Sequence, residues 1–264
     1  MKTMKSLLFG MLLLGITLEP VLGSQAGHSK SKVLSKMMAQ SKQLVLVMTR
    51  DWNAVDGELR SYERASGGQA WQPKGEKFSV VVGRNGMAWG KGLHGNPAAL
   101  AKSNDPIKKE GDGRAPAGIF SLGSAFGYAS KEKSGTVKLP YLQATAMSEC
   151  VDDTRSSYYN QLVERDKIAK PDWDSSEQMR RNDELYRWGV VVDHNADKPE
   201  ASAGSCIFLH IWSGAGKGTA GCTAMEPRKI EELLSWLDPK KKPVLVQLPQ
   251  AEAERLREAL GLPR

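Results

Sequence analysis

The chain has 264 residues, of which 40% are hydrophobic and 25% charged, and its formal net charge is +7. This composition is ordinary for a globular protein with one large or two small domains. The positive charge suits an anionic polymer or a membrane surface, but it forms no basic block and accompanies no nucleic-acid-binding motif, so we expect no nucleic-acid partner.

Residues 1–23 have the pattern of a secretory signal peptide. Lys2 and Lys5 precede an apolar run over residues 6–18, which is too short to span a bilayer comfortably. We expect cleavage after Gly23, with a retained N-terminal anchor as the alternative. The mature protein would then be exported to the periplasm or cell envelope without a stable membrane span, because no other stretch is apolar enough for one.

The chain after the polar segment 24–42, in which we expect one short amphipathic helix, reads as short strands separated by glycine turns. Apolar or alternating runs predict strands over residues 44–48, 59–63, 78–82 and 87–90. Such spacing predicts a mainly β fold, a β-sandwich or barrel. We expect a single domain over residues 43–264.

Two regions depart from this strand pattern. Residues 156–168 and 175–187 are rich in charge and tyrosine, and we interpret them as two short helices in an insertion over about 150–188. Such an insertion could form a lid or substrate wall, or it could be surface decoration. Near the C-terminus we expect an amphipathic helix beginning near Pro227, then a strand over 244–248 and a helix over 251–260.

The stretch over residues 205–225 contains the candidate chemistry. A buried strand delivers His210 at its end, a glycine-rich loop follows, and Cys222 comes directly after Gly221. A thiol needs a base within hydrogen-bond reach to become a good nucleophile near neutral pH. The alternatives are a buried, inert cysteine with a core histidine, or a zinc set that would add Cys206 and His194; no paired cysteine spacing supports the zinc set, so we expect no metal.

A second strand, beginning at Tyr186 and running to Val192, ends at Asp193-His194-Asn195. Strand ends carry functional residues more often than strand interiors do. We therefore expect His194 to contact the substrate or orient an imidazole, with a structural role as the alternative.

The segment Thr219-Ala220-Gly221-Cys222 and the upstream His210 resemble the catalytic motif of the L,D-transpeptidase catalytic-domain family. In that family the cysteine of a Ser/Thr-x-Gly-Cys element is the nucleophile. A second segment, Ala115-Pro116-Ala117-Gly118-Ile119-Phe120, resembles the Thr/Ala-Pro-x-Gly-x-Phe signature that packs beside the family's cleft. The resemblance covers roughly residues 43–248 and indicates a divergent branch, since the interval from histidine to cysteine is short.

The resemblance implies an exported enzyme that acts on peptidoglycan stem peptides, as donor and acceptor, in cell-wall cross-linking or remodelling. Cys222 would form a thioester, His210 would be its base, and the backbone near Gly221 would bind the oxyanion. Trp212 and Thr219 would contact the substrate, and no cofactor is needed. The alternatives are an L,D-carboxypeptidase using the same site and a non-catalytic peptidoglycan-binding module.

Many members of the family carry an arginine two residues after the nucleophile, where this chain has Ala224. We therefore expect Arg84 or Arg114, on loops at strand ends, to bind the substrate carboxylate. If Cys222 stays a thiol, Cys150 and Cys206 are free to form a disulfide in an oxidising compartment, the alternative being two separate buried thiols.

Overall fold

The structure is a computed structural model that describes residue 35 and residues 38–264. The expected signal peptide over residues 1–23, its cleavage site and most of the polar segment 24–42 lie outside the described residues. Within the described part of the chain, no helix is both long and apolar enough to cross a membrane.

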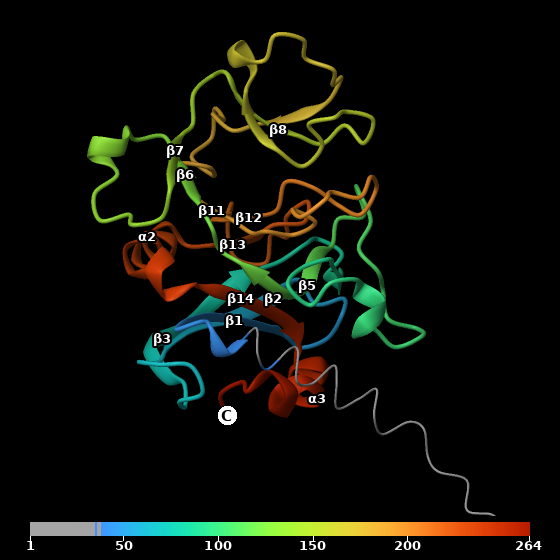
Figure 1. Ribbon diagram of the computed structural model, residues 1–264, viewed down its shortest axis with the longest axis vertical. Helices are drawn as coiled ribbons and strands as arrows, with labels where there is room; N and C mark the ends of the chain where they lie inside the picture. Colours follow the sequence, from blue (N-terminus) through green and yellow to red (C-terminus); the bar gives the residue numbers. More distant parts are fainter. Residues whose placement is uncertain (1–34, 36–37) are drawn as a thin grey trace, which may run out of the picture.

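One mixed sheet of 11 strands forms most of the fold (Figure 1), in the spatial order β4-β5-β14-β1-β2-β3-β13-β12-β11-β6-β7. In chain order these strands are β1 (Gln43–Thr49), β2 (Asp56–Glu63), β3 (Gln72–Val81), β4 (Met87–Trp89), β5 (Ala115–Ser121), β6 (Ala125–Gly127), β7 (Tyr141–Gln143), β11 (Trp188–Val191), β12 (Phe208–Ile211), β13 (Thr223–Met225) and β14 (Val244–Pro249). The prediction of a mainly β fold is confirmed.

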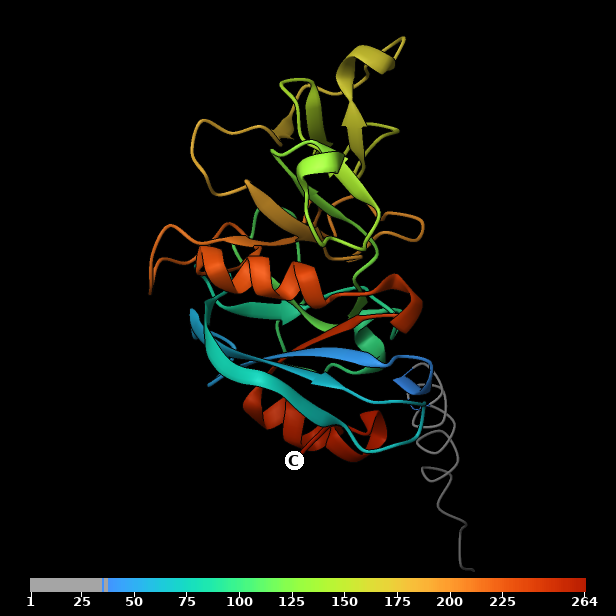
Figure 2. The same cartoon turned by 90° about the vertical axis from the view of Figure 1, so that its left-hand side faces the viewer.

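The strand β1 is at the centre of the main core. It pairs in parallel with β14 and antiparallel with β2. Its apolar residues are buried on both faces, as Leu44 and Val45 show with 0% exposure each. The expected helices are present as α2 (Pro227–Trp236) and α3 (Gln250–Leu260), and α2 buries Ile230, Leu233 and Leu234. Figure 2 shows α3 below the layer of β1, β2 and β3, and α2 above it.

The strands β3 and β13 are joined by a single residue pair, Val81 with Ala224, so this is the weakest junction in the sheet. The loop before β13 reinforces this junction. Arg84 donates its backbone N–H to the Thr219 carbonyl at 2.8 Å, and Thr219 donates its own to Val82 at 2.9 Å. A Cβ at Gly218 would lie 2.5 Å from the Arg84 Cα, so this close approach requires a glycine. The loop that carries Cys222 is thereby fixed to the end of β3.

The insertion is a small antiparallel sheet and contains no α-helix. The prediction of helices over residues 156–168 and 175–187 is therefore wrong. Its strands, in the order β10-β8-β9, are β8 (Ser148–Val151), β9 (Leu162–Glu164) and β10 (Ser176–Gln178), and a single turn of 3-10 helix covers Arg165–Lys167.

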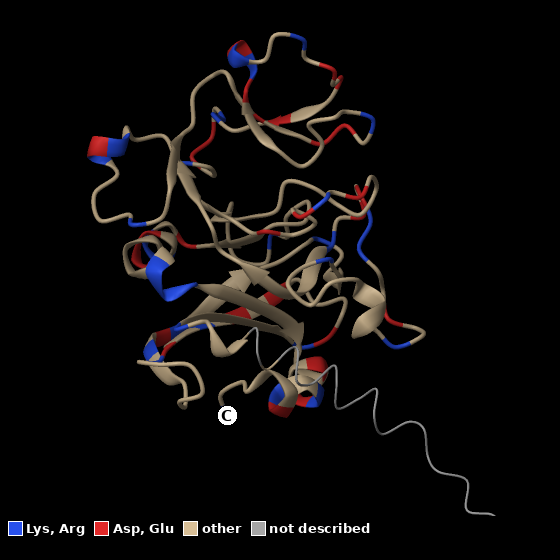
Figure 3. Ribbon diagram, in the orientation of Figure 1, with Lys and Arg blue, Asp and Glu red and all other residues tan. Residues whose placement is uncertain are grey.

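Turn-forming side chains explain this error. Asp153 accepts the backbone N–H of Arg155 at 3.0 Å, and Asp172 accepts that of Ser157 at 3.0 Å. Aspartate and serine side chains that bind nearby backbone in this way stabilise turns in preference to helix. Figure 3 shows that residues of both charges are interspersed along the loops of the insertion.

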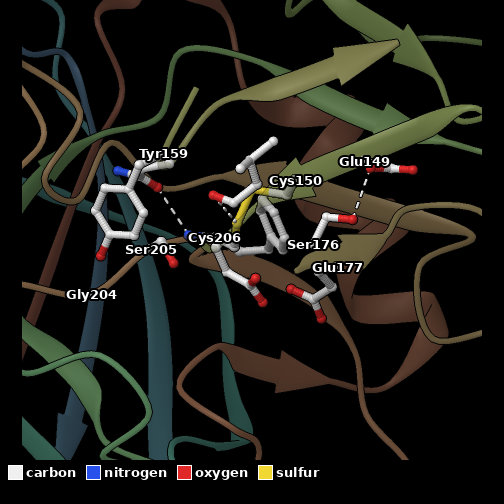
Figure 4. Close-up of a disulfide and its surroundings, with 12 residues drawn as sticks. Glu149, Cys150, Tyr159, Ser176, Glu177, Gly204, Ser205 and Cys206 are labelled. Carbon is white, nitrogen blue, oxygen red and sulfur yellow. Dashed lines mark hydrogen bonds between the residues drawn. A yellow bond between two sulfur atoms is a disulfide. The ribbon is translucent and has the colours of Figure 1, made fainter. Parts of the chain in front are cut away.

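A disulfide joins the small sheet to the large one. Cys150, in β8, is bonded to Cys206, which lies two residues before β12, and their Cα atoms are 5.9 Å apart (Figure 4). Cys222 is the free cysteine. The disulfide therefore holds the insertion against the strand that carries His210.

This disulfide should contribute strongly to stability, because it closes a loop with a sequence separation of 56. The double variant Cys150→Ala/Cys206→Ala should lower the free energy of unfolding by about 4 kcal/mol on the chain-entropy model, as measured by urea denaturation. The unaltered protein, denatured without reductant, should titrate one thiol. A count of three thiols would contradict the pairing.

Candidate active site

The parallel pairing of β12 and β13 brings the two candidate catalytic residues together. Leu209 pairs with Thr223 and His210 with Ala224. Side chains alternate between the faces of a strand, so His210 and Cys222 project from the same face, together with Phe208. The backbone N–H of Phe208 donates to the Cys222 sulfur at 3.3 Å. Both catalytic candidates line one cavity.

Cys222 is protonated in the resting site. Burial raises the pKa of its thiol well above the ordinary value, and the nearby Glu177 carboxyl raises it further. The hydrogen bond from Phe208 and the nearby Tyr186 side chain act in the opposite direction and lower it. The thiol donates towards the Cys206 carbonyl at 3.6 Å. A base must therefore remove this proton before the sulfur can attack.

His210 is the candidate for that base. Its Nδ1 lies 2.7 Å from the Ile211 carbonyl. A carbonyl can only accept, so Nδ1 carries the hydrogen and Nε2 has the free lone pair. Burial lowers the pKa of His210 from 6.5 to about 4, although the hydrogen bond to Ile211 raises it. The imidazole is thus neutral near pH 7 and able to accept a proton.

The predicted Thr219 and Gly221 shape the loop around the nucleophile. The Thr219 hydroxyl donates to the Cys222 carbonyl at 2.6 Å and accepts the Gly221 N–H at 3.1 Å. The Gly221 N–H is thereby occupied. The Cys222 N–H has no acceptor among the described residues, so it is the backbone donor left for an oxyanion.

The cavity beside Cys222 has a volume of about 640 Å³. Five of the predicted site residues line it, as expected for residues that contact a substrate: Cys222, His210, Trp212, Thr219 and Gly221. The insertion supplies the opposite wall through Asp152, Ser176, Glu177 and Gln178. Of the two interpretations of the insertion, the structure thus favours a cavity wall over surface decoration.

The expectation that His194 contacts the substrate is not supported, because the residue lies outside this cavity. It is 1% exposed, its Nε2 is 3.0 Å from the Ala203 carbonyl, and its ring packs edge-on against Phe120 at 5.9 Å. Burial lowers the pKa of His194 to about 4. Its place is structural, behind the strands that form the site.

Neither arginine expected to bind the substrate lines the cavity. Arg114 donates to the carbonyls of Trp52 and Met87 at 3.1 and 2.9 Å, so its guanidinium holds backbone together. Arg84 is exposed in the turn after β3. The cations that do line the cavity are Lys108, Arg181 and Lys217. The prediction failed because the sequence did not show which loops face the cysteine.

Sequence reasoning also missed Tyr186 and Glu177, which line the cavity. Tyr186 had been assigned only to the start of a strand, and Glu177 to a helix. The disulfide was the available signal: pairing of Cys150 with Cys206 places the neighbours of β8 beside the cysteine loop. Glu177 pairs directly with Cys150 in the small sheet.

The buried neutral histidines should make stability depend on pH. The pKa of His194 and of His210 falls from 6.5 in the unfolded chain to about 4 in the folded protein, so between these values only the unfolded chain binds the proton. The free energy of unfolding should be highest above pH 6.5 and fall by about 3 kcal/mol per histidine towards pH 4. Urea denaturation across this range tests it, and His194→Gln should flatten the decline; an equal decline in that variant would contradict the assignment.

The comparison with known families agrees with this geometry. The family model of the L,D-transpeptidase catalytic domain (YkuD) matches residues 65–246, which include β12, β13 and both catalytic candidates. No curated protein and no solved structure matches the chain. The chain belongs to the YkuD family of L,D-transpeptidase catalytic domains.

Proposed function

We propose that this protein is an exported cysteine L,D-transpeptidase that acts on peptidoglycan stem peptides. The observation that carries the proposal is the pair formed by Cys222 and His210. The two residues share one sheet face and one cavity, and the Nδ1 of His210 is already bonded to the Ile211 carbonyl. Nε2 is then free to take the thiol proton, which is the requirement for a cysteine nucleophile.

The reaction starts from a neutral thiol and a neutral imidazole. His210 Nε2 takes the Cys222 proton as the sulfur attacks the carbonyl at an L-to-D centre of the donor peptide, next to diaminopimelate. The Cys222 N–H supports the negative oxygen of the tetrahedral intermediate. The imidazolium then gives its proton to the leaving amine, the C–N bond breaks, and a thioester remains on Cys222.

The acceptor resolves this thioester. An acceptor amine gives up a proton to His210, attacks the acyl carbon and releases the thiolate, which regains its proton. The product is a cross-link between stem peptides, consistent with a role in cell-wall biogenesis and cell shape. Water in place of the amine would give L,D-carboxypeptidase activity from the same residues.

Replacement of the nucleophile should remove turnover without unfolding the protein. With Cys222→Ala we expect no products from defined muropeptides, and with His210→Gln a loss of about 10²–10⁴-fold, the scale of general base catalysis. Mass spectrometry of the products is the measurement. A new dimer indicates transpeptidation, and loss of the terminal D-residue alone indicates carboxypeptidation.

Retained turnover in Cys222→Ala would refute the nucleophile assignment. If the unaltered mature protein bound muropeptides but converted none, it would be a binding module. A circular dichroism spectrum equal to that of the unaltered protein is the control for folding of both variants.

Lys217 is the cavity cation best placed to bind a substrate carboxylate. Lys108 is paired with Asp112 at 2.6 Å, and Arg181 with Asp183 at 2.7 Å. Lys217 lies exposed on the glycine loop, and within the described chain no carboxylate forms an ion pair with it. It therefore replaces Arg84 and Arg114 in our account of how the stem peptide is held.

Lys217→Gln should raise the KM of a stem peptide about two- to fivefold while kcat changes little, as expected for an exposed ion pair of up to about 1 kcal/mol. Steady-state kinetics on muropeptides measures this. Arg84→Gln, an exposed change outside the cavity, is the matched control and should leave KM unaltered. An equal KM effect on a substrate with amidated carboxylates would contradict the assignment.

A further inference from the structure

We propose that Tyr186, held by Glu177 of the inserted sheet, is a positioning residue that donates a hydrogen bond to the Cys222 thiolate. The proposal rests on the proposed function only in taking Cys222 as the nucleophile. It makes the insertion part of the catalytic machinery as well as a wall of the cavity.

The Tyr186 ring packs against His210 and Phe208. Its centroid lies 5.0 Å from that of His210 at an interplanar angle of 75°, and 5.6 Å from that of Phe208 at 84°. Tyr186 is only 3% exposed, in the same apolar cluster as Cys222 and the disulfide. The ring therefore restricts the plane of the imidazole.

The Tyr186 hydroxyl is bound to a carboxyl group in the cavity that Cys222 also lines. It is hydrogen-bonded to Glu177 Oε1. Tyr186 and Cys222 line the same cavity, and the Tyr186 side chain lowers the pKa of Cys222 against the effect of burial. Glu177 is placed by the pairing of β10 with β8, where it lies opposite Cys150. The disulfide to Cys206 thus fixes the distance between Glu177 and the nucleophile.

The hydroxyl has one hydrogen, so the protonation of Glu177 decides where it points. A protonated Glu177 donates to the Tyr186 oxygen, and the Tyr186 O–H is free to donate to the sulfur. An ionised Glu177 accepts the Tyr186 O–H instead, and its charge also disfavours a thiolate nearby. Thiolate formation at Cys222 is therefore favoured when Glu177 is neutral.

The surroundings of Glu177 favour the neutral form. Burial raises the pKa of its carboxyl, and Asp152 and Glu110 raise it further. Arg181, with Nη1 at 3.9 Å, and the Tyr186 hydrogen bond act in the opposite direction. Arg181 is already paired with Asp183, which weakens its hold on Glu177. Lys108 and Lys217 line the same cavity, and Glu177 also faces Cys222, whose pKa it raises.

The test is the rate of alkylation of Cys222 by iodoacetamide as a function of pH, in the mature protein with its disulfide intact. Tyr186→Phe keeps the ring and removes the donor, so alkylation below the thiol pKa should slow about tenfold and its pH profile should move to higher pH, as for loss of a hydrogen bond to a charged group. Glu177→Gln abolishes the ionised form, which would accept the Tyr186 O–H and repel the thiolate, and should move the profile to lower pH.

Tyr159→Phe is the matched control. Its hydroxyl is bound to a cavity carboxylate, Glu110, at 2.5 Å, and the residue is 5% exposed, but it does not contact Cys222. Its alkylation profile should match that of the unaltered protein. The proposal is overturned if Tyr186→Phe leaves the profile in place, if Tyr159→Phe shifts it equally, or if Glu177→Gln shifts it to higher pH.

If Tyr186→Phe fails to fold, a shift to higher pH in Glu177→Gln still overturns the proposal. Alkylation reports the ionisation of Cys222 and needs no peptide substrate. A protein that turns over no muropeptide can therefore still support the proposal, and an active transpeptidase can still refute it.

Discussion

The site depends on the parallel pairing of β12 with β13. Because the two strands run in the same direction, the chain after Ile211 must cross back to the beginning of β13, and Cys222 is the residue it reaches just before the strand starts. This return places Cys222 beside Phe208, two residues from His210 on the same face. A short interval between histidine and cysteine is thus enough for the two to meet, provided that the loop between them is held in place.

Several contacts hold that loop. The Thr219 backbone binds Val82 and Arg84, just after the end of β3. The Thr219 hydroxyl donates to the Cys222 carbonyl. The disulfide to Cys150 fixes Cys206, which lies just before β12 on the other side of the site. Cys222 and His210 are both buried and neutral in the resting structure. In the proposed reaction, proton transfer to His210 therefore coincides with attack by the sulfur, and donors placed in advance stabilise the charge that develops.

Apolar runs and glycine turns were enough to predict the central strands, because a strand covered on both faces, such as β1, must be apolar on both. The i, i+3, i+4 spacing of Ile230, Leu233 and Leu234 likewise predicted α2. The small sheet could not be predicted in this way. Its strands are short, and pairing, turns and a disulfide determine them. For the same reason Tyr186 and Glu177 were missed, whereas a local motif was enough to propose Cys222 and His210 as site residues.

The central claim is that Cys222 carries the acyl group. The most direct measurement is the mass of the mature protein mixed with a tetrapeptide donor and no acceptor amine, followed by peptide mapping. The account predicts an adduct equal in mass to the donor minus its terminal D-residue, attached through a thioester to Cys222 and released by hydroxylamine. An adduct on any other residue, or release of the D-residue with no adduct at any time after mixing, would contradict it.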